Sequence, residues 1–326
     1  MGFYEETNPP DIDESIVLDT IHSIFPQITN PEVRFHYHGT HNVYIVEDQY
    51  IFRFPSTYHT PKRRREYVRR EVKLLKLLKS HLSSPIPEPE FVDFKKDTPF
   101  MGYRMIPGER FSKLYLNASP EQLRGLGEQI GRSVGEFHSI MESVLDGEAG
   151  SFTPEAYRSE QSAIFDRVQN EVYPQLSTNE REWTESIFND FLEPDENFEF
   201  EPVITHGDLY TTNILVDPET IELTGILDFE NVDLYDPAVD FIFLREGADL
   251  LKSLLHAYPH RIDSTLGDRV TYIIGKQPFF YFLKGFDFGL DRMVKFGHTR
   301  IIEHMKNWNY FIKVAEQCFG PLRLRR

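Results

Sequence analysis

Cysteine is almost absent from this 326-residue sequence, since Cys318 is the only one. A single cysteine excludes a disulfide within the chain and any zinc site built from several cysteines. Long apolar runs are absent too, and none approaches the roughly 20 residues of a membrane-spanning helix. The N-terminal stretch MGFYEETNPPDIDE lacks the charged and then apolar pattern of a signal peptide. Together these absences predict a cytoplasmic protein without a membrane partner.

Basic residues are too few to balance the acidic ones, and the formal net charge is −17 at pH 7. A chain this acidic is not expected to bind nucleic acid by itself, because nucleic-acid backbones are also negative. The dense basic run KRRREYVRR, at 62–70, is interpreted as a solvated helix face. The acidic balance instead favours solubility and attracts cationic ligands.

Proline and turn residues divide the chain into segments of different periodicity, and no internal repeat is visible. Alternating β-branched and aromatic residues predict short strands, and apolar residues at helical spacing predict helices. The first part of the chain is predicted to hold a helix, three strands, a helix and two strands, at 12–25, 33–37, 43–46, 50–54, 62–80, 91–94 and 100–106. The remainder is predicted to be mostly helical, beginning with a helix at 120–139.

These elements predict an α+β fold, in which a small antiparallel sheet with one main helix precedes a larger, mostly helical part. A length of 326 residues also suggests about two domains. The pair Pro107-Gly108 follows the last strand of the sheet and is the expected boundary. The predicted domains are residues 1–106 and 107–326.

One segment, ITHGDLYTTNILVDPETIELTGILDFE at 204–230, gathers polar residues around a predicted hairpin. A turn centred near residue 219 places Asn213 opposite about residue 225. Asp228 then lies just beyond, at the open end of the same hairpin. The two residues are therefore expected to lie close together.

Carboxylates also gather at this end of the hairpin. Asp208 is expected to reach it from the preceding loop, whereas Asp217 belongs to the turn and is interpreted as a solvated turn residue. Clustered carboxylates raise each other's pKa and destabilise the fold unless a cation neutralises them. Asp208, Asn213 and Asp228 together offer oxygen ligands of the kind that Mg²⁺ uses, completed by water and nucleotide phosphates.

The spacing of these residues matches the kinase pattern H-x-D-x-x-x-x-N followed by D-F-x. His206, Asp208 and Asn213 provide the first part, and Asp228 begins the second. In that pattern the first aspartate accepts or orients the hydroxyl of the substrate. The asparagine and the second aspartate hold metal on the triphosphate. His206 is interpreted as a brace of the loop.

On these residues the chain resembles the aminoglycoside phosphotransferase family, small-molecule kinases with the protein-kinase-like fold. THGDLYTTNILVD resembles the catalytic loop of that family, and GILDFENVDLYDPAVDF resembles its metal-binding segment. PFMGYRMIPGERF is similar to its interlobe hinge, and GRSVGEFHSI to the first helix of its large lobe. The resemblance covers about residues 33–250 and is closest to the branch that phosphorylates the 2″ hydroxyl of aminoglycosides. It implies a bilobal fold with a nucleotide-binding lobe at 1–106 and a catalytic, substrate-binding lobe at 107–326.

The N-terminal part contains the cation and the carboxylate that a kinase uses to steady nucleotide phosphates. Arg53 lies in the predicted strand YIFRFP, and Glu71 lies on the apolar stripe of the predicted helix at 62–80. A carboxylate on such a stripe needs a buried partner, and Arg53 is the predicted one. Arginine stands where kinases generally have lysine, and the two are not interchangeable. Gly39 lies where the family covers the phosphates, although an ordinary hairpin loop explains it equally well.

The resemblance also implies which residues bind the nucleotide base and the acceptor. The backbone of Arg104 and Ile106 is expected to meet the base, with Tyr103 beside it. In the 2″ branch, acids at the positions of Glu246 and Asp249, on a predicted helix FIFLREGADLL, bind the ammonium groups of the acceptor. Glu230 and Asp233, which also follow Asp228, add negative charge nearby, so all four acids are expected to bind a cationic acceptor. Asn231 replaces an acid of the 2″ branch, and a solvated helix face is the alternative interpretation.

The sequence therefore predicts a phosphotransferase that uses Mg²⁺ and moves the γ-phosphoryl group of ATP or GTP to a hydroxyl. The acceptor is expected to be a small cationic molecule such as an aminoglycoside, which implies a role in antibiotic resistance. One alternative is a kinase for another small alcohol, such as a macrolide, a choline-like metabolite, homoserine or a sugar. The other is a nucleotide-binding module without turnover.

Overall fold

The computed structural model describes residues 9–95 and 97–323, which form two compact units. The first unit comprises the chain up to Leu114 together with residues 143–148 and 211–232, and the second comprises the rest. The chain therefore passes from one unit to the other more than once. The predicted domain boundary after the fifth strand stays a prediction.

The first unit is built on a five-stranded antiparallel sheet with the order β1-β2-β3-β5-β4. Phe52 and Phe54, two residues apart on β3, are fully buried, as expected for residues on one face of a strand. Glu47 and Asp48 form the turn after β2 with positive φ angles. The strands match the predicted ones within two residues: β1 (Val33–His38), β2 (His41–Val46), β3 (Tyr50–Pro55), β4 (Phe91–Asp93) and β5 (Phe100–Arg104).

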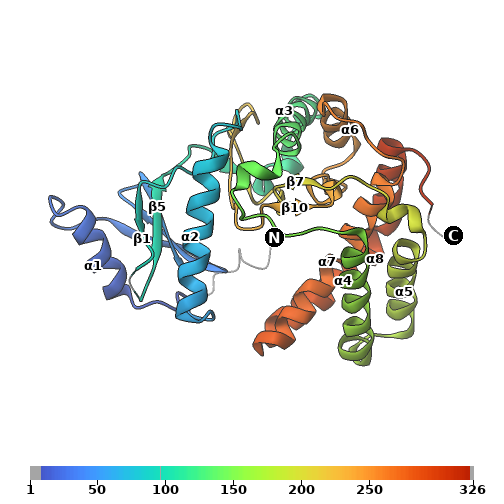
Figure 1. The fold of residues 1–326 in the computed structure, drawn as a ribbon, viewed down its shortest axis with the longest axis horizontal. Coiled ribbons are helices and arrows are strands. Elements are labelled where there is room, and N and C mark those ends of the chain that lie inside the picture. Colours follow the sequence, from blue (N-terminus) through green and yellow to red (C-terminus); the bar gives the residue numbers. More distant parts are fainter. Residues whose placement is uncertain (1–8, 96, 324–326) are drawn as a thin grey trace. The chain divides into compact units, whose positions relative to one another are not determined.

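Two helices accompany this sheet, α1 (Glu14–Ile24) and α2 (Pro61–Leu78), and both were predicted (Figure 1). Asp13 caps α1 by accepting a hydrogen bond from the backbone N–H of Ser15 over 2.8 Å. Helix α1 buries apolar side chains in the core that surrounds Phe52. Pro61 begins α2, where its missing N–H costs no hydrogen bond.

A smaller sheet of the first unit carries the predicted hairpin, with the order β6-β8-β9. Its strands are β6 (Glu109–Arg110), β8 (Ile214–Val216) and β9 (Leu223–Ile226). Gly108, with φ +126°, passes so close to β9 that a Cβ atom there would lie 2.3 Å from Thr224 Oγ1. Only glycine allows this approach.

The second unit is mostly helical, as predicted, with one short antiparallel pair of strands. Helices α3 and α6 lie side by side (Figure 1) because small residues line their contact. A Cβ atom at Gly127 or Gly131 of α3 would lie within 2.3 Å of a carbonyl oxygen of α6. The elements are α3 (Pro120–His138), α4 (Pro154–Arg167), α5 (Thr178–Leu192), β7 (Val203–Thr205), β10 (Asp233–Tyr235), α6 (Ala248–Ala257), α7 (Leu266–Phe288) and α8 (Asp291–Phe319).

The predicted helix at 241–251 is wrong in its first half. A single 3₁₀ turn, η8 (Pro237–Asp240), is followed by non-helical chain, and α6 begins only at Ala248. Gly247 precedes it with φ +94°, a conformation outside the helical range. Glu246 therefore lies before the helix rather than on it. No helix in the described part of the chain combines the length and apolar composition that a bilayer crossing requires.

Candidate active site

The open end of the β8–β9 hairpin brings the two predicted metal ligands together. The backbone N–H of Leu227 donates to the carbonyl of Asn213 over 2.8 Å, so Asn213 lies beside the residue that precedes Asp228. The predicted partner of Asn213, about residue 225, is wrong by two residues. The turn is centred later than expected, and a bulge adds one residue to β9. The correction places Asn213 nearer to Asp228.

The backbone of Asp228 is strained. Its φ angle is +70°, a left-handed conformation that few residues other than glycine adopt, although aspartate does so more often than most. Strain of this kind is common at functional sites. By contrast, Asp217 accepts hydrogen bonds from the backbone N–H groups of Glu219 and Thr220, both over 2.9 Å. The prediction that Asp217 is a turn residue is confirmed.

The buried ion pair predicted between Arg53 and Glu71 is present. Arg53 Nη1 donates to Glu71 Oε1, and the two side chains are 6% and 3% exposed. Burial raises the pKa of Glu71, and the Arg53 guanidinium opposes this effect. Arg53 Nη2 also lies 3.5 Å from Asp228 Oδ1. One guanidinium therefore joins strand β3, helix α2 and the predicted metal ligand.

We expect the Arg53–Glu71 pair to show strong coupling in a double-mutant cycle of Arg53→Met and Glu71→Gln. Either single change leaves a buried group without its partner, which costs about 3–5 kcal/mol, whereas the double change removes both. Urea unfolding of the four proteins measures the coupling free energy. Lys62 and Glu66 form an exposed pair 3.8 Å apart on the same helix and serve as the control, with an expected coupling of about 0.3–0.5 kcal/mol. Equal coupling in both pairs would contradict the role of burial.

His41 is a neighbour of this network that the sequence did not identify. It is 3% exposed, and burial together with the Arg53 charge lowers its pKa well below the ordinary value. Its Nδ1 lies 3.4 Å from Arg53 Nη2 and 3.8 Å from Glu230 Oε2. A neutral ring in this place accepts a hydrogen bond from the guanidinium. Only strand pairing, which aligns β2 with β3, reveals this contact.

The interpretation of 62–70 as a solvated face is wrong at Arg70. Arg70 Nη1 donates to the carbonyl of Glu230 over 2.7 Å, and Nη2 donates to the carbonyl of Val232 over 2.8 Å. Arg70 Nη2 also reaches the carbonyl of Glu148 at 3.1 Å. These bonds hold the segment after Asp228 against helix α2.

In the second unit, the loop that carries Asp208 is held by the buried carboxylate of Asp240. Asp240 accepts hydrogen bonds from the backbone N–H groups of His206 over 2.8 Å and Gly207 over 3.0 Å. His138 Nε2 lies 3.2 Å from the same carboxylate. His206 Nδ1 in turn accepts from the backbone N–H of Asp208 over 3.3 Å. The contacts agree with the predicted bracing role of His206.

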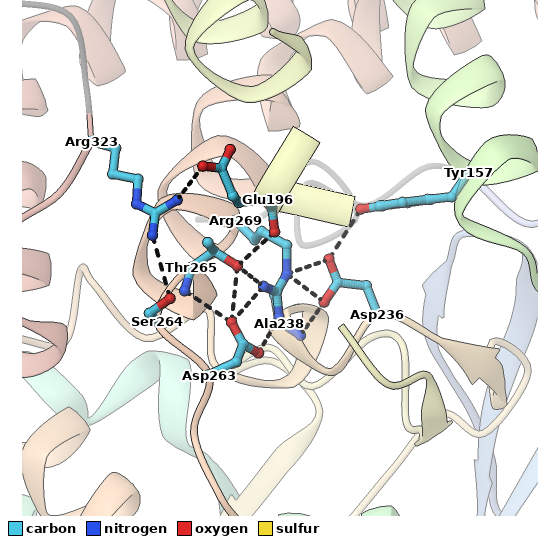
Figure 2. A network of polar contacts seen from close by, with 9 residues as sticks. All are labelled: Tyr157, Glu196, Asp236, Ala238, Asp263, Ser264, Thr265, Arg269 and Arg323. Carbon is cyan, nitrogen blue, oxygen red and sulfur yellow. Dashed lines mark hydrogen bonds and ion pairs between the residues drawn. The ribbon is translucent and has the colours of Figure 1, made fainter. Parts of the chain in front are cut away.

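Asp240 depends on a second buried network, which Figure 2 shows. Asp236 caps η8 by accepting from the backbone N–H of Ala238 over 2.9 Å. Arg269 Nε donates to both oxygens of Asp236, at 3.0 and 3.1 Å, and its Nη atoms donate to Asp263. Arg269 and Asp236 are both fully buried. The start of η8 is therefore fixed by an ion pair, and its end holds the loop of Asp208.

The residues predicted to meet the nucleotide base lie on β5 and directly after it. Tyr103 is buried, which raises the pKa of its hydroxyl. Arg104 forms an ion pair with Glu90 at 3.4 Å. Ile106 packs against β9, since a Cβ atom at Gly225 would lie 2.8 Å from it. Their contact with a nucleotide stays a prediction.

Gly39 lies in the two-residue turn between β1 and β2. Its backbone N–H donates to the carbonyl of His41 over 3.0 Å. Unlike Gly108, Gly39 has no positive φ angle, so the turn does not need glycine for its backbone conformation. Its predicted place over the phosphates stays a prediction.

The four acids predicted to bind a cationic acceptor have different surroundings. Asp233 accepts from the backbone N–H groups of Gly150 over 2.6 Å and Leu234 over 2.8 Å. Asp249 forms an ion pair with Arg124 at 2.8 Å on the surface of the second unit. Both carboxylates thus have structural partners already.

The other two acids lie in different units. Glu230, in the first unit, approaches His41 as described above. Glu246, in the second unit, is partly buried, and burial raises the pKa of its carboxyl to about 7. Whether these acids face an acceptor stays a prediction, as does the predicted proximity of Asp208 to Asn213 and Asp228, which belong to the other unit.

A magnesium ion fits the donor set at the hairpin end. In the described ranges, no three side chains of histidine, cysteine, aspartate or glutamate group closely enough to hold a metal alone. Mg²⁺ does not require such a group, because it binds through one or two carboxylates and keeps waters and substrate phosphates. Asp228 and Asn213 supply a carboxylate and an amide oxygen of this kind.

Comparison with solved structures identifies the fold. A structure of APH(2″)-IIIa with GDP and kanamycin has 20% identity and a TM-score of 0.79, covering 90% of this chain and 99% of that one. The streptomycin–ATP–APH(2″)-IIa ternary complex has 21% identity and a TM-score of 0.65, covering 95% and 100%. The macrolide 2′-phosphotransferase MphH from Brachybacterium faecium has 21% identity and a TM-score of 0.68, covering 87% and 98%. The chain has the fold of these small-molecule kinases, which confirms the predicted kinase-like α+β class.

The family follows from a separate match. The family model described as the phosphotransferase enzyme family, APH, matches residues 32–266. The chain belongs to this family, and the predicted resemblance is confirmed. It is therefore an enzyme, a small-molecule kinase with an alcohol group as acceptor.

Proposed function

We propose that this enzyme transfers the γ-phosphoryl group of ATP or GTP to a hydroxyl of a small cationic molecule, with aminoglycosides as the first class to test. The observation that carries the proposal is the buried network of Arg53, Glu71 and Asp228, which places a cation beside the predicted metal ligand. Arg53 Nε is buried and has no hydrogen-bond partner among the described residues. A buried N–H of this kind is costly unless a ligand accepts from it, and a nucleotide phosphate is such an acceptor.

The proposed reaction is an in-line displacement at the γ-phosphorus. The acceptor oxygen forms a bond to phosphorus, the bond from phosphorus to the bridging oxygen breaks, and a nucleoside diphosphate leaves. Asp208 orients the acceptor hydroxyl and takes its proton. Asp240 and His206 keep the Asp208 loop in place. Arg53, oriented by Glu71, steadies the phosphates as negative charge shifts toward the leaving group.

Asn213 and Asp228 would hold the magnesium ion, which neutralises charge on the phosphates when it is bound. The base of the nucleotide would lie against the backbone of Arg104 and Ile106, with Tyr103 beside it. Gly39 would cover the phosphates. Both ATP and GTP are proposed as donors, because the solved relatives include complexes with GDP and with ATP.

The acceptor is proposed to bind through acidic side chains. Glu230, Asp233, Glu246 and Asp249 are the proposed cation-binding acids, and the solved relatives include complexes with kanamycin and streptomycin. A second candidate, a kinase for another small alcohol, gains support because Asp233 and Asp249 already have partners within the chain. A macrolide phosphotransferase shares the fold at similar identity. We also propose, on sequence grounds alone, a cytoplasmic location and no nucleic-acid partner.

An assay that measures the consumption of ATP or GTP in the presence of an acceptor tests the proposed function. Kanamycin-like, erythromycin-like, choline, homoserine and sugar acceptors are compared side by side. Turnover with any of them supports the kinase, and turnover with aminoglycosides supports the cationic acceptor. Nucleotide binding without turnover on any of these acceptors would contradict the proposed acceptor classes.

If aminoglycosides bind the acids, the variant E246Q/D249N should raise the acceptor KM roughly tenfold and leave the nucleotide KM within about twofold, since each partly exposed pair contributes about 0.2–1 kcal/mol. Acceptor binding should also weaken as salt rises, because salt screens such pairs. Because the pKa of Glu246 is about 7, its carboxylate forms as pH rises from 6 to 8. Acceptor affinity should increase over that range in the wild type and less in E246Q.

The variant Arg124→Ala serves as the matched control for Asp249. It removes the guanidinium that pairs with Asp249 at 2.8 Å, so it should leave the carboxylate available and lower the acceptor KM. If the acceptor KM does not change with salt, with pH or in the variants E246Q, E246Q/D249N and Arg124→Ala, these acids form a solvated surface and the proposal of a cationic acceptor is wrong.

A further inference from the structure

A dense group of hydrogen bonds surrounds Asp11, a residue outside the proposed machinery. Asp11 Oδ2 accepts from Ser56 Oγ over 2.5 Å, from the backbone N–H of Thr57 over 2.7 Å and from Thr57 Oγ1 over 2.8 Å. Asp11 Oδ1 accepts from Asn42 Nδ2 over 2.6 Å. The backbone N–H of Asp11 donates a hydrogen bond to Asn42 Oδ1 over 3.0 Å. The segment before α1 is thus tied to the start of β2 and to the chain after β3.

The same segment is tied to the end of β1. His38 Nδ1 lies 2.8 Å from the carbonyl of Pro9, and His38 Nε2 lies 3.2 Å from Ser56 Oγ. Although burial acts to raise it, hydrogen bonds from His38, Ser56 and Asn42 hold the pKa of Asp11 well below its usual range. The carboxylate is therefore charged at every pH at which the enzyme would work, and charge-assisted bonds of this kind are the strong ones.

These bonds hold the residues on both sides of the turn between β1 and β2, namely His38 before it and Asn42 after it. The turn is only two residues long, and the carbonyl of Thr40 accepts from the backbone N–H of Ser56 over 2.8 Å. It contains a single glycine, Gly39, without a positive φ angle. A phosphate-covering turn with several glycines would be mobile, whereas this one is held by the segment that precedes α1.

The turn leads directly to the nucleotide side of the sheet. Successive side chains of a strand point to opposite faces, so Asn42 contacts Asp11 while its neighbour His41 contacts Arg53. Arg53 in turn contacts Glu71 and lies beside Asp228. Asp11 is therefore linked through Asn42 and the backbone of β2 to His41, which contacts Arg53 at the proposed phosphate site, all within the first unit.

We infer that Asp11 is a positioning residue for nucleotide binding: it fixes the β1–β2 turn and thereby presents His41 and Arg53 to the phosphates. The inference rests on the proposed function, because it assigns Asp11 to the same nucleotide site. Asp11 itself touches no reacting atom. A purely structural role would change the stability of the first unit without changing its affinity for nucleotide once it is folded.

The test compares Asp11→Asn with Asp13→Asn in the full chain. Each change removes one negative charge, and the two positions are only two residues apart. Asp13, however, only caps α1, and asparagine caps a helix equally well. Calorimetric titration with magnesium ATP and magnesium GTP measures the nucleotide Kd below the unfolding temperature of each protein. We expect D11N to weaken binding of the preferred nucleotide about tenfold, because a charge-assisted contact between Arg53 and a phosphate depends on close geometry. D13N should match the wild type.

Two further variants separate positioning from folding. Asn42→Ala breaks the link to β2 without changing charge and should weaken nucleotide binding by a similar factor, even if D11N does not fold. Asp11→Glu keeps the carboxylate and should recover most of the affinity that D11N loses. If D11N and N42A lower the melting temperature but bind nucleotide like the wild type, the inference is wrong. If the wild type binds neither nucleotide, the proposed function fails, and the inference fails with it.

Discussion

Replacing Asp208 with asparagine is expected to lower kcat by about 10²–10⁴-fold, the contribution that a positioned general base makes. Asparagine preserves the size of the side chain and can still orient a hydroxyl, but it cannot accept its proton. The bonds that hold the loop use the backbone N–H groups of His206, Gly207 and Asp208, so the change should leave the loop intact. Nucleotide Kd should therefore stay within about twofold of the wild-type value.

The measurement is steady-state turnover with the acceptor that the screen identifies, together with calorimetric nucleotide binding. Asp217→Asn is the matched control, because Asp217 lies on the same segment and only closes the hairpin turn, a role that asparagine also fills. D217N should keep full activity. Equal turnover in D208N and D217N would remove Asp208 from the catalytic role.

Replacing Arg269 with methionine is expected to lower the free energy of unfolding by about 3–5 kcal/mol, because it leaves the buried Asp236 carboxylate without its cation. The two side chains are fully buried and are joined by two hydrogen bonds (Figure 2). Activity should fall as well at temperatures where the variant is still folded. The reason is that Asp236 fixes the start of η8, and η8 ends at Asp240, which holds the loop of Asp208.

Urea unfolding measures this loss, and Arg158→Met is the control. Arg158 pairs with Asp195 at 2.7 Å in the same unit, but both side chains are exposed, so that change should cost about 1 kcal/mol or less. The stabilisation by this network should also depend on pH. Burial acts to raise the pKa of Asp263, but Arg269 and Thr265 lower it to about 2. The stability that the ionised Asp263 contributes is complete above pH 4 and is lost as pH falls toward 2. If R269M and Arg158→Met lower the free energy of unfolding by similar amounts, the buried network stabilises the protein no more than an exposed ion pair does.

Local patterns in the sequence were enough for the sheet, the first two helices and the turn at Asp217. Alternation along a strand and apolar spacing along a helix depend on near neighbours, so they survive in the folded chain. The Arg53–Glu71 pair was predictable for a related reason. A carboxylate on an apolar helical stripe cannot remain buried without a partner, and Arg53 was the nearby charge on a strand.

Prediction failed where a few backbone torsions decided the outcome. The register of the β8–β9 hairpin differs by two residues because the turn is centred later and a bulge lengthens β9. The helix expected at 241–251 begins only at Ala248, after Gly247 takes a positive φ angle. Neither a bulge nor a single left-handed glycine changes the hydrophobic pattern, which is why the pattern did not reveal them.

The sequence by itself determined which residues are candidates for the chemistry: Asp208, Asn213 and Asp228 have the order and spacing of the kinase pattern, and Arg53 stands where kinases generally have lysine. Tertiary structure alone decided which residues support them. Asp11 meets Asn42, Arg70 meets the backbone at Glu230, and Asp236 meets Arg269 across 31, 160 and 33 residues of chain. Such contacts form because buried charges must find partners wherever the fold brings them together, and no local pattern records where that is.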